Sequence, residues 1–291
     1  MDPLVSIITV NYNQTQVTEE FLLSIQKISY PNYELFVVDN ASPTQGVGSL
    51  IPKFPEFRFI ESKENLGFSG GNNLAVKEAK GKYLLFINND TEVEPDFLQP
   101  LVRLMESNPK IGMASPKIRY FFEDNLVQYA GSTEMNSYTA RSFFIGEKQE
   151  DDGRFDTTMR TAFIHGAAML VSAGAMEKVG LMEDQFFLYY EEFDWCARFK
   201  KAGFEIWYVA DSLVKHKESI ATGKNSPLKV YYQTRNRIFY VRRNFTGSQK
   251  LVFTLFFTIF SIPKNTVKFV INQRFDHLKA FYRGIFWNFK H

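Results

Sequence analysis

Cysteine is almost absent from this sequence, since Cys196 is the only one among 291 residues. A single thiol excludes an internal disulfide and any metal site built from several cysteines. A chain whose one thiol stays reduced fits the cytosol. The first residues also lack a basic segment and a small-residue cleavage site, so we expect no secretory signal peptide.

Long apolar runs are scarce as well. The uncharged, mostly apolar run Leu251–Ile262 has 12 residues and spans about 18 Å as a helix, at about 1.5 Å per residue. The hydrocarbon core of a bilayer is about 30 Å thick, so this run is too short to cross it. Pro263 follows, and we expect it to break the helix.

The composition is that of a globular protein. Hydrophobic residues make up 45% of the chain and charged residues 23%, while 30 Phe and 14 Tyr raise the aromatic share to 16%. At 33.8 kDa, the chain has room for one large α/β domain, or for one domain with a helical appendage.

Charge is divided unevenly along the chain. Residues 1–212 carry 19 Lys and Arg against 30 Asp and Glu, whereas residues 213–291 carry 15 against 2. A basic tail on an acidic body indicates an anionic partner, either nucleic acid or a membrane surface. The acidic body repels phosphate backbones, so we expect no nucleic-acid partner.

The N-terminal part alternates between strand and helix patterns. Apolar runs predict strands at residues 5–10, 34–38, 57–60 and 83–87, and helical spacing predicts helices at residues 15–28 and 72–79. A Gly-rich turn is predicted at residues 65–73 and a mobile loop at residues 149–153. Successive βαβ units produce a mostly parallel sheet with helices on both faces.

Polar residues follow three of these strands. The first strand ends at Asn11 and Asn13, the second at Asp39, and the fourth at Asn88–Asp90. Ligands bind outside the carboxyl ends of such strands, so this edge is the predicted site. The alternative is that Asn and Asp form ordinary turns here.

An acidic segment and a histidine come later. Glu191, Glu192 and Asp194 crowd the first turn of a predicted helix, where the helix dipole favours acidic residues. Alternatively, a carboxylate close to others and to aromatic residues has a raised proton affinity and suits general-base chemistry. His216 follows a strand predicted at residues 203–209 and is a further candidate.

Several motifs occur together in one order. They are Ser6–Asn13, Val37–Ser42, Glu64–Asn73, Asn88–Thr91, His165–Leu170, Glu191–Arg198 with Lys201–Phe204, and His216 with Tyr231–Arg237. From about residue 5 to residue 244, this set resembles the inverting glycosyltransferases of family 2. Within them it is most similar to the rhamnosyltransferase-like branch of bacterial cell-surface polysaccharide assembly.

The resemblance implies a fold and a domain organisation. The fold is α/β of the GT-A type, a Rossmann-like and mostly parallel sheet with flanking helices, and it would occupy residues 1–230. The composition and spacing of residues 231–291 predict a basic, aromatic-rich and amphipathic helical tail, which associates with a membrane or forms oligomers. Leu278, Phe281, Tyr282, Ile285 and Phe289 share a helical spacing, and we expect them to face anionic lipid. The alternative is packing on the catalytic domain or on a partner in a homodimer.

The resemblance also implies roles for single residues. The nucleotide would be held by Asn11, Asn13, Asp39, Asn65, Gly67, Phe68, Gly71, Asn72 and Asn89. Asp90 and His216 would bind Mg²⁺ or Mn²⁺, the hard cations that suit a diphosphate. The family's metal motif often has Asp where this chain has Asn88.

Glu192 matches the catalytic base, where many relatives have Asp. It would take the proton of the acceptor hydroxyl while Lys217 or Arg235 helps to stabilise the leaving diphosphate. The acceptor would be oriented, or the base tuned, by Glu191, Asp194, Trp195, His165 and Gly166.

Donor and acceptor stay open at this point. The resemblance favours dTDP-rhamnose as donor, then a UDP-hexose or UDP-N-acetylhexosamine, and a saccharide or polyprenyl-linked saccharide as acceptor. The enzyme would work in the cytoplasm, on the inner face of the cell membrane. A dehydrogenase is set aside because no Gly-rich turn follows the first strand. A nucleotidyltransferase is set aside because no Gly- and basic-rich loop follows that strand either. A non-catalytic scaffold of the same fold is the remaining alternative.

Overall fold

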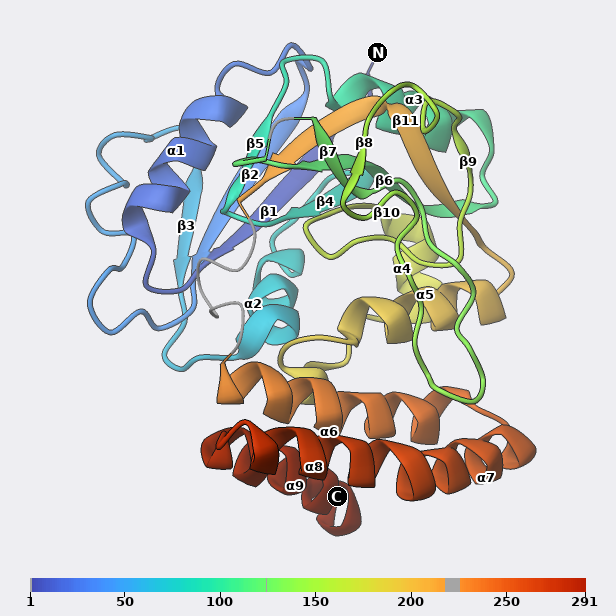
Figure 1. Cartoon of the computed structure of the whole chain (residues 1–291). Helices are drawn as coiled ribbons and strands as arrows, with labels where there is room; N and C mark the ends of the chain where they lie inside the picture. The colour runs from blue at the N-terminus through green and yellow to red at the C-terminus, as the bar shows by residue number, and fades with distance from the viewer. Residues whose placement is uncertain (1, 124, 218–225) are drawn as a thin grey trace.

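The computed structural model describes residues 2–123, 125–217 and 226–291. It consists of a twisted sheet with helices on both faces and a layer of C-terminal helices beneath it (Figure 1). The strands are β1 (Val5–Asn11), β2 (Tyr33–Asp39), β3 (Arg58–Glu61), β4 (Tyr83–Ile87), β5 (Thr91–Val93), β6 (Ile111–Tyr120), β7 (Leu126–Tyr129), β8 (Gln149–Glu150), β9 (Met159–Arg160), β10 (Ala168–Ser172) and β11 (Glu205–His216).

The helices divide between the sheet and the C-terminal layer. Those of the sheet domain are α1 (Thr15–Ile25), α2 (Gly67–Val76), α3 (Leu98–Ser107), α4 (Ala173–Val179), the short 3₁₀ helix η1 (Asp184–Phe186) and α5 (Glu191–Lys201). The layer contains α6 (Pro227–Asn244), α7 (Gly247–Phe256), the π-helical segment η2 (Phe257–Ser261), α8 (Ile262–Ile271) and α9 (Phe275–Lys290).

The central strands are parallel, as predicted. The sheet order is β3-β2-β1-β4-β10-β6-β11-β5, and β1 pairs in parallel with both β2 and β4. Asn11 lies opposite Asp39 in this register, so the polar ends of neighbouring strands meet at one edge. That edge is where the sequence predicts the site.

The other half of the sheet is mixed. Strand β10 runs antiparallel between β4 and β6, and β11 runs parallel to β6. At its end β11 pairs with β5, with His216 opposite Thr91. This pairing carries His216 beside the residues that follow β4, although 126 positions separate it from Asp90.

Both faces of the sheet are covered by apolar side chains. In β1, Ile7 belongs to the core under α1 and α3, and the next residue, Ile8, belongs to the core under α2, α4 and α5. Alternate side chains of a strand point to opposite faces, so each strand of apolar residues supplies both cores.

Helix α2 corrects the predicted Gly-rich turn. The helix begins at Gly67, five positions earlier than expected, and contains most of that turn. A Cβ on Gly71 would meet Val10 Cγ1 at 3.1 Å, so a glycine there lets α2 pack closely on β1. The glycines therefore mark a tight helix–strand contact.

The predicted mobile loop at residues 149–153 is also wrong. Gln149 and Glu150 form β8, which pairs with β7, and Asp151 is buried. The Asp151 carboxylate pairs with Lys117 and Arg119 of β6. These ion pairs connect residues more than 30 positions apart, and a local pattern does not reveal them.

Pro263 does not break the tail helix. The chain stays helical from α7 through η2 into α8, where Pro263 occupies one of the first two positions. A proline in the first turn of a helix loses little, because its missing N–H has no partner there, and a π-helical turn relieves the preceding backbone.

The face of α9 that was expected to contact lipid packs against the protein instead. Phe281 and Ile285 are buried, and Gly284 lies so close to α6 that a Cβ would meet the Tyr231 carbonyl oxygen at 2.8 Å. The alternative, packing on the protein, therefore holds for this face, while Phe289 stays exposed. Within the described ranges, no helix is long and apolar enough to cross a membrane.

Candidate active site

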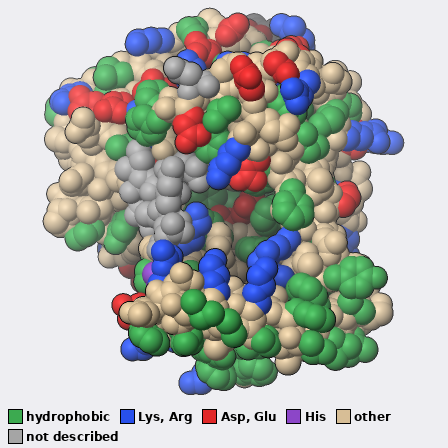
Figure 2. All heavy atoms as spheres, in the orientation of Figure 1, with side chains coloured by type: hydrophobic (Ala, Val, Ile, Leu, Met, Phe, Trp, Pro, Cys, Tyr) green, Lys and Arg blue, Asp and Glu red, His purple; other side chains and the backbone are tan. Residues whose placement is uncertain are grey.

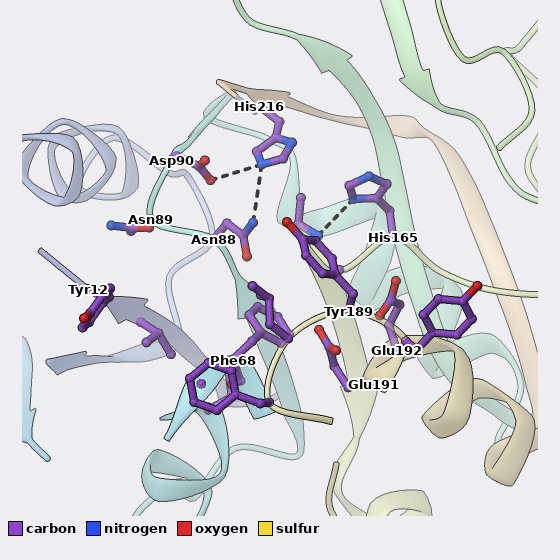
Figure 3. Close-up of a pocket in the computed structure, with 18 of the residues that line it drawn as sticks. Tyr12, Phe68, Asn88, Asn89, Asp90, His165, Tyr189, Glu191, Glu192 and His216 are labelled. Atoms are coloured by element: carbon purple, nitrogen blue, oxygen red, sulfur yellow. Dashed lines mark hydrogen bonds and ion pairs between the residues drawn. The ribbon is translucent and has the colours of Figure 1, made fainter. Parts of the chain in front are cut away.

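A cavity of about 530 Å³ opens at the predicted edge of the sheet. Its walls come from the ends of β1 and β4, the start of α2, the end of β11 and the first turns of α5 and α6. Figure 3 shows ten of the lining residues with labels. Its size lies within the range of small-molecule sites.

The cavity collects most of the predicted residues. Those that line it are Asn65, Gly67, Phe68, Asn72, Asn89, Asp90, His165, Gly166, Glu191, Glu192 and His216. Eight predicted residues lie outside the lining of the cavity, namely Asn11, Asn13, Asp39, Gly71, Asp194, Trp195, Lys217 and Arg235.

Asn11, Asn13 and Asp39 shape the turn behind one wall. Asn11 Nδ2 donates to Asp39 Oδ1 at 3.1 Å, which fixes the ends of β1 and β2 to each other. Asn13 Oδ1 accepts from the backbone N–H groups of Thr44 and Gln45 at 3.1 and 2.8 Å. These side chains are occupied in joining two loops, so they support the wall beside Tyr12 and Asn40.

Asp90 and His216 face each other across the upper part of the cavity (Figure 3). Asp90 Oδ1 lies 3.1 Å from His216 Nε2, and no group of the described residues donates a hydrogen bond to this buried oxygen. Burial favours the neutral acid, but the nearby His216 outweighs burial and holds the pKa of Asp90 below its usual value. The carboxylate therefore stays charged at neutral pH.

Gln128 sets the orientation of His216. His216 Nδ1 lies 2.8 Å from Gln128 Oε1, an acceptor, so Nδ1 carries the proton of the neutral ring. When the ring is neutral, the lone pair of Nε2 points toward Asp90, and a cation between the two groups would satisfy both; Asn88 Nδ2 lies 3.4 Å from the same nitrogen. A histidine held this way is prepared to bind a cation.

These residues fit a divalent metal that shares its coordination with a substrate. The described part of the chain holds no cluster of three or more His, Cys, Asp or Glu side chains, so protein groups alone do not enclose an ion. A carboxylate with an unused oxygen and an oriented imidazole supply two ligands. Mg²⁺ and Mn²⁺ sites of this kind take further oxygens from phosphate groups and water.

His165 is neutral and buried beside the same region. Its Nδ1 accepts the backbone N–H of Ala167 at 3.0 Å, and its ring packs on Phe144 with centroids 4.9 Å apart. Burial lowers the pKa of His165 to about 3. The ring is therefore an uncharged part of the cavity wall at physiological pH.

Glu191 and Glu192 stand on the opposite side of the cavity (Figure 3). Each has one buried carboxyl oxygen, Oε2, without a hydrogen-bond partner in the described residues. Burial raises the pKa of Glu192 to about 7, and burial together with the neighbouring Glu192 raises that of Glu191 well above its usual value. A carboxyl group with a pKa near neutrality can accept a proton from a substrate.

Asp194 and Trp195 turn away from the cavity. Asp194 is buried, and its carboxylate pairs with Arg198 at 2.9 Å and with Arg243 at 3.0 Å. Trp195 is buried in the core and donates Nε1–H to the carbonyl of Gly180. Both residues fix α5 to its surroundings, and the geometry offers neither of them to an acceptor.

Lys217 and Arg235 are engaged elsewhere. Lys217 is buried between Glu20 and Glu92, with its Nζ 2.9 Å from a Glu92 oxygen. The Arg235 guanidinium donates to the carbonyl groups of Gln185 and Phe186. Their charges are used within the protein, so the geometry does not support the predicted phosphate contacts.

The cavity also contains residues that the sequence analysis missed. Gln128, Tyr189 and Lys229 are the most informative, and Lys229 brings a cation to the lining from the first turn of α6. Its Nζ lies 5.8 Å from the centre of the Tyr189 ring. The basic composition after residue 212 contains Lys229 but does not single it out.

Comparison with known proteins identifies the family. A sequence profile described as Glycosyl transferase family 2 matches residues 6–180, more than half of the chain. The chain belongs to this family. The fold resembles that of the solved mannosyltransferase PcManGT from Pyrobaculum calidifontis, in complex with GDP-Man and Mn²⁺, with a TM-score of 0.60 at 18% identity over 83% of this chain and 64% of that one. The predicted GT-A fold is confirmed.

Two curated relatives extend the comparison. The low-salt glycan biosynthesis hexosyltransferase Agl10 of Haloferax volcanii is 26% identical over 239 residues, which are 80% of this glycosyltransferase and 73% of the relative. The N-acetylglucosaminyl-diphospho-decaprenol L-rhamnosyltransferase of Mycobacterium tuberculosis is 22% identical over 77% of this chain and 80% of the relative. Several other curated relatives are longer, and this chain spans less than half of their length.

Proposed function

We propose that this glycosyltransferase moves a sugar, with inversion, from a nucleoside diphosphate sugar to a saccharide acceptor in polysaccharide synthesis. The observation that carries the proposal is the pairing of two sites across one cavity, with Asp90 and His216 on one side and Glu191 and Glu192 on the other (Figure 3). A cation site and a proton acceptor facing one space suit a displacement at the carbon between a diphosphate and a hydroxyl.

The nucleoside is assigned to the wall formed by β1 and α2. Tyr12 and Phe68 offer aromatic surface there, and Asn40, Asn65 and Asn72 offer polar groups. The Asn11–Asp39 hydrogen bond keeps this wall in place from behind. Gly67 belongs to the same wall, and its φ of +70° is one that an L side chain rarely adopts.

The diphosphate is assigned to Asp90, His216 and Lys229. A bound Mg²⁺ or Mn²⁺ would neutralise the charge that develops on the leaving nucleoside diphosphate. Asp90 and His216 hold the two ligand positions of this chain, while Gln128 keeps the imidazole in the required tautomer. Lys229 adds a positive charge at the same lining.

Glu192 is assigned as the general base. Its carboxylate takes the proton from the acceptor hydroxyl while the oxygen attacks the anomeric carbon from the face opposite the leaving diphosphate. Burial and Glu192 raise the pKa of Glu191 well above its usual value, which favours the neutral acid, and Glu191 is assigned to hold the acceptor in that form. One displacement of this kind inverts the anomeric centre.

The test of this assignment is Glu192→Gln. We expect turnover, measured as release of nucleoside diphosphate with Mn²⁺ present, to fall by at least about 100-fold, the usual contribution of a general base. Donor binding measured by calorimetry should change by less than about threefold, since the amide keeps the size of the carboxyl group. Glu134→Gln, an exposed carboxylate paired with Lys200, is the matched control and should keep full turnover. Near-wild-type turnover of Glu192→Gln would refute the base, and a wild-type chain that binds donors without turnover would support a scaffold.

For the donor we propose dTDP-rhamnose, with a UDP-hexose or UDP-N-acetylhexosamine next, and a polyprenyl-linked saccharide as acceptor. The support is the similarity to the N-acetylglucosaminyl-diphospho-decaprenol L-rhamnosyltransferase of Mycobacterium tuberculosis, whose name includes a decaprenol-linked substrate. Thermal shifts against these donors with Mn²⁺ should rank dTDP-rhamnose first. A larger shift with a UDP-sugar would reassign the donor and leave the base assignment intact.

We further propose that the C-terminal layer docks on an anionic membrane surface, at the inner face of the cell membrane. Large hydrophobic side chains are exposed on α7–α9 and η2, namely Leu251, Leu255, Ile259, Phe260, Val267, Val270, Ile271, Phe275, Phe286 and Phe289. Six basic side chains of the same layer are also exposed, namely Lys264, Lys268, Arg274, Lys279, Arg283 and Lys290. We call the apolar and basic residues together the apolar–basic face. Figure 2 shows hydrophobic side chains gathered over this layer at the lower end of the molecule. Exposed apolar residues bordered by cations are typical of proteins that lie on anionic lipid.

A further inference from the structure

We propose that Arg235 and Asn236 of α6 are positioning residues for the carboxyl pair Glu191–Glu192, because they hold the strained backbone of residues 185–190 that leads into α5. This inference rests on the proposed function of that pair. It assigns to α6, a helix at the junction with the C-terminal layer, a task in the chemistry of the cavity.

The segment before α5 has an unusual backbone. Phe187, Tyr189 and Tyr190 have φ angles of +63°, +70° and +74°, in the left-handed region that residues with a Cβ rarely adopt. Tyr190 immediately precedes the first helical residue, Glu191. Such backbone persists only where its surroundings hold it in place, and it tends to occur at functional sites.

The side chain of Asn236 holds this segment in place by hydrogen bonds. Its side chain is completely buried, and Nδ2 donates to the carbonyl oxygens of Phe186, Leu188 and Tyr189 at 2.8, 2.7 and 2.7 Å. The two N–H groups of one amide are therefore shared among three carbonyls of the strained segment. A change in φ at Phe187 or Tyr189 would turn at least one of these carbonyls away.

Arg235 fixes the amide and adds two bonds of its own. Its Nε–H donates to Asn236 Oδ1 at 2.7 Å, so the Nδ2 end of the amide faces the segment. Its terminal nitrogen donates to the carbonyls of Gln185 and Phe186. The two adjacent side chains of α6 thus contact the carbonyls of four residues, and we call them the α6 clamp.

The clamp is supported by the C-terminal layer. The Arg235 guanidinium lies 4.6 Å from the centre of the Trp287 ring of α9, and Asn288 Nδ2 donates to the Arg235 carbonyl at 3.0 Å. From the opposite side, the Phe68 N–H of α2 donates to the Phe187 carbonyl at 2.6 Å. Residues 185–190 are therefore held between α2 and α6, and α9 packs against α6 on its other side.

The direction in which α5 begins decides where its first side chains point. Tyr190 is the residue from which α5 starts, and the Asp194 N–H donates to its carbonyl at 3.0 Å as the first bond of the helix. A rotation at Tyr189 or Tyr190 would swing Glu191 and Glu192 relative to Asp90 and His216. Catalysis needs these groups within a fraction of an ångström of their working positions.

The first experiment compares Asn236→Ala, the milder Arg235→Lys and the control Ser212→Ala in the full chain. Ser212 is also buried and donates one bond to a carbonyl, that of Phe97 at 2.6 Å, but it lies outside the cavity. Turnover is followed as Mn²⁺-dependent hydrolysis of dTDP-rhamnose, UDP-glucose and UDP-N-acetylglucosamine. We expect both clamp variants to lower kcat by at least about tenfold with KM for the donor within about twofold, and Ser212→Ala to change neither. A kcat loss no larger than that of Ser212→Ala would overturn the proposal.

The second experiment separates positioning from general damage. If the clamp acts through Glu192, Asn236→Ala should lower the residual turnover of Glu192→Gln by less than about twofold, because the group it positions is already gone. A further tenfold loss in the double variant would contradict the proposal.

The third experiment does not depend on turnover. Hydrogen exchange of the backbone amides of residues 185–192 should accelerate at least about tenfold in Asn236→Ala, while those of residues 205–216 in β11 stay unchanged. Unchanged exchange at residues 185–192 would refute the clamp even if no donor were hydrolysed. Absence of wild-type turnover with all three donors would count against the proposed function instead.

Discussion

Among single residues, the pair Glu191–Glu192 is an arrangement that opposes folding. Two adjacent acids are placed in the lining, and an oxygen of each has no hydrogen-bond partner in the described residues. Burial of an ionised carboxylate without a partner opposes folding, so the pair lowers stability for the sake of its proton affinity. This trade is typical of active sites.

The pair predicts a pH-dependent difference in stability. The pKa of Glu192 is about 7 in the folded protein against 4.5 when exposed, so the folded state binds the proton more tightly. Its contribution to the unfolding free energy is therefore complete below about pH 4.5 and is lost as the pH rises to about 7. Gln carries no such proton, so Glu192→Gln should be more stable than the wild type at pH 8, by on the order of 1–3 kcal/mol. Melting curves at pH 5 and pH 8 test this, and an equal difference at both values would contradict it.

The contact between Gln128 and His216 predicts that substitution of Gln128 changes the affinity for the metal. Outer groups that orient a histidine ligand usually change metal affinity by about 10- to 100-fold when they are removed. Gln128→Leu cannot accept the proton of His216 Nδ1, so Mn²⁺ binding in the presence of a nucleoside diphosphate, measured by electron paramagnetic resonance, should weaken at least about tenfold. Gln128→Glu keeps the acceptor and should bind within about threefold of the wild type. Equal affinity of all three proteins would show that Gln128 does not orient a ligand.

Resemblance and strand ends pointed to eleven residues that line the cavity, but not to their partners. Asp90, Glu192 and His216 stand in motifs that can be recognised along the chain. Gln128 is 88 positions from His216, and its contact exists only because β7 and β11 flank β6. Arg235 stands in a recognisable motif, but only the fold shows that its guanidinium donates to the carbonyl groups of Gln185 and Phe186.

At the scale of elements, the sequence predicted what local patterns control. The apolar runs of β1, β2 and β4 are buried strands because their side chains fill both faces of the sheet. Helix α2 was predicted to start too late because glycine has a low helix propensity, and here tertiary packing outweighs it. Strand β8 has only two residues, and the ion pairs of the next residue, Asp151, are made with the distant strand β6, so no local pattern indicates it.

Helix α6 shows how an element can belong to two parts of the molecule. It starts at Pro227 and crosses residue 230, where the sequence analysis ended the catalytic domain. One set of its side chains contacts the segment before α5, and another packs against α9. The C-terminal layer therefore supports the cavity, and its removal would take away the clamp along with the exposed face.

For the whole molecule, the separation of charge indicates an orientation. The first 212 residues are acidic, and the helices that follow carry most of the basic excess. An anionic surface would attract the layer and repel the sheet domain, so the apolar–basic face would meet the lipid while the cavity stays on the far side of α6. A polyprenyl-linked acceptor would then have to reach the cavity past α6, where Lys229 lies.

The last prediction concerns this face. Each basic residue near an anionic bilayer contributes about 1 kcal/mol, so reversing Lys264 and Lys268 to Glu should weaken binding by at least about 30-fold. The full chain should float with vesicles of one-third phosphatidylglycerol in phosphatidylcholine, and binding should fall in high salt because the charges are screened. Lys27→Glu with Lys110→Glu, two exposed lysines of the sheet domain, is the matched control and should float like the wild type. The membrane proposal fails if the wild-type protein does not float with the vesicles. If that protein also elutes as a dimer in size-exclusion chromatography, and the changes at Lys264 and Lys268 dissociate the dimer, the face joins two copies of the chain.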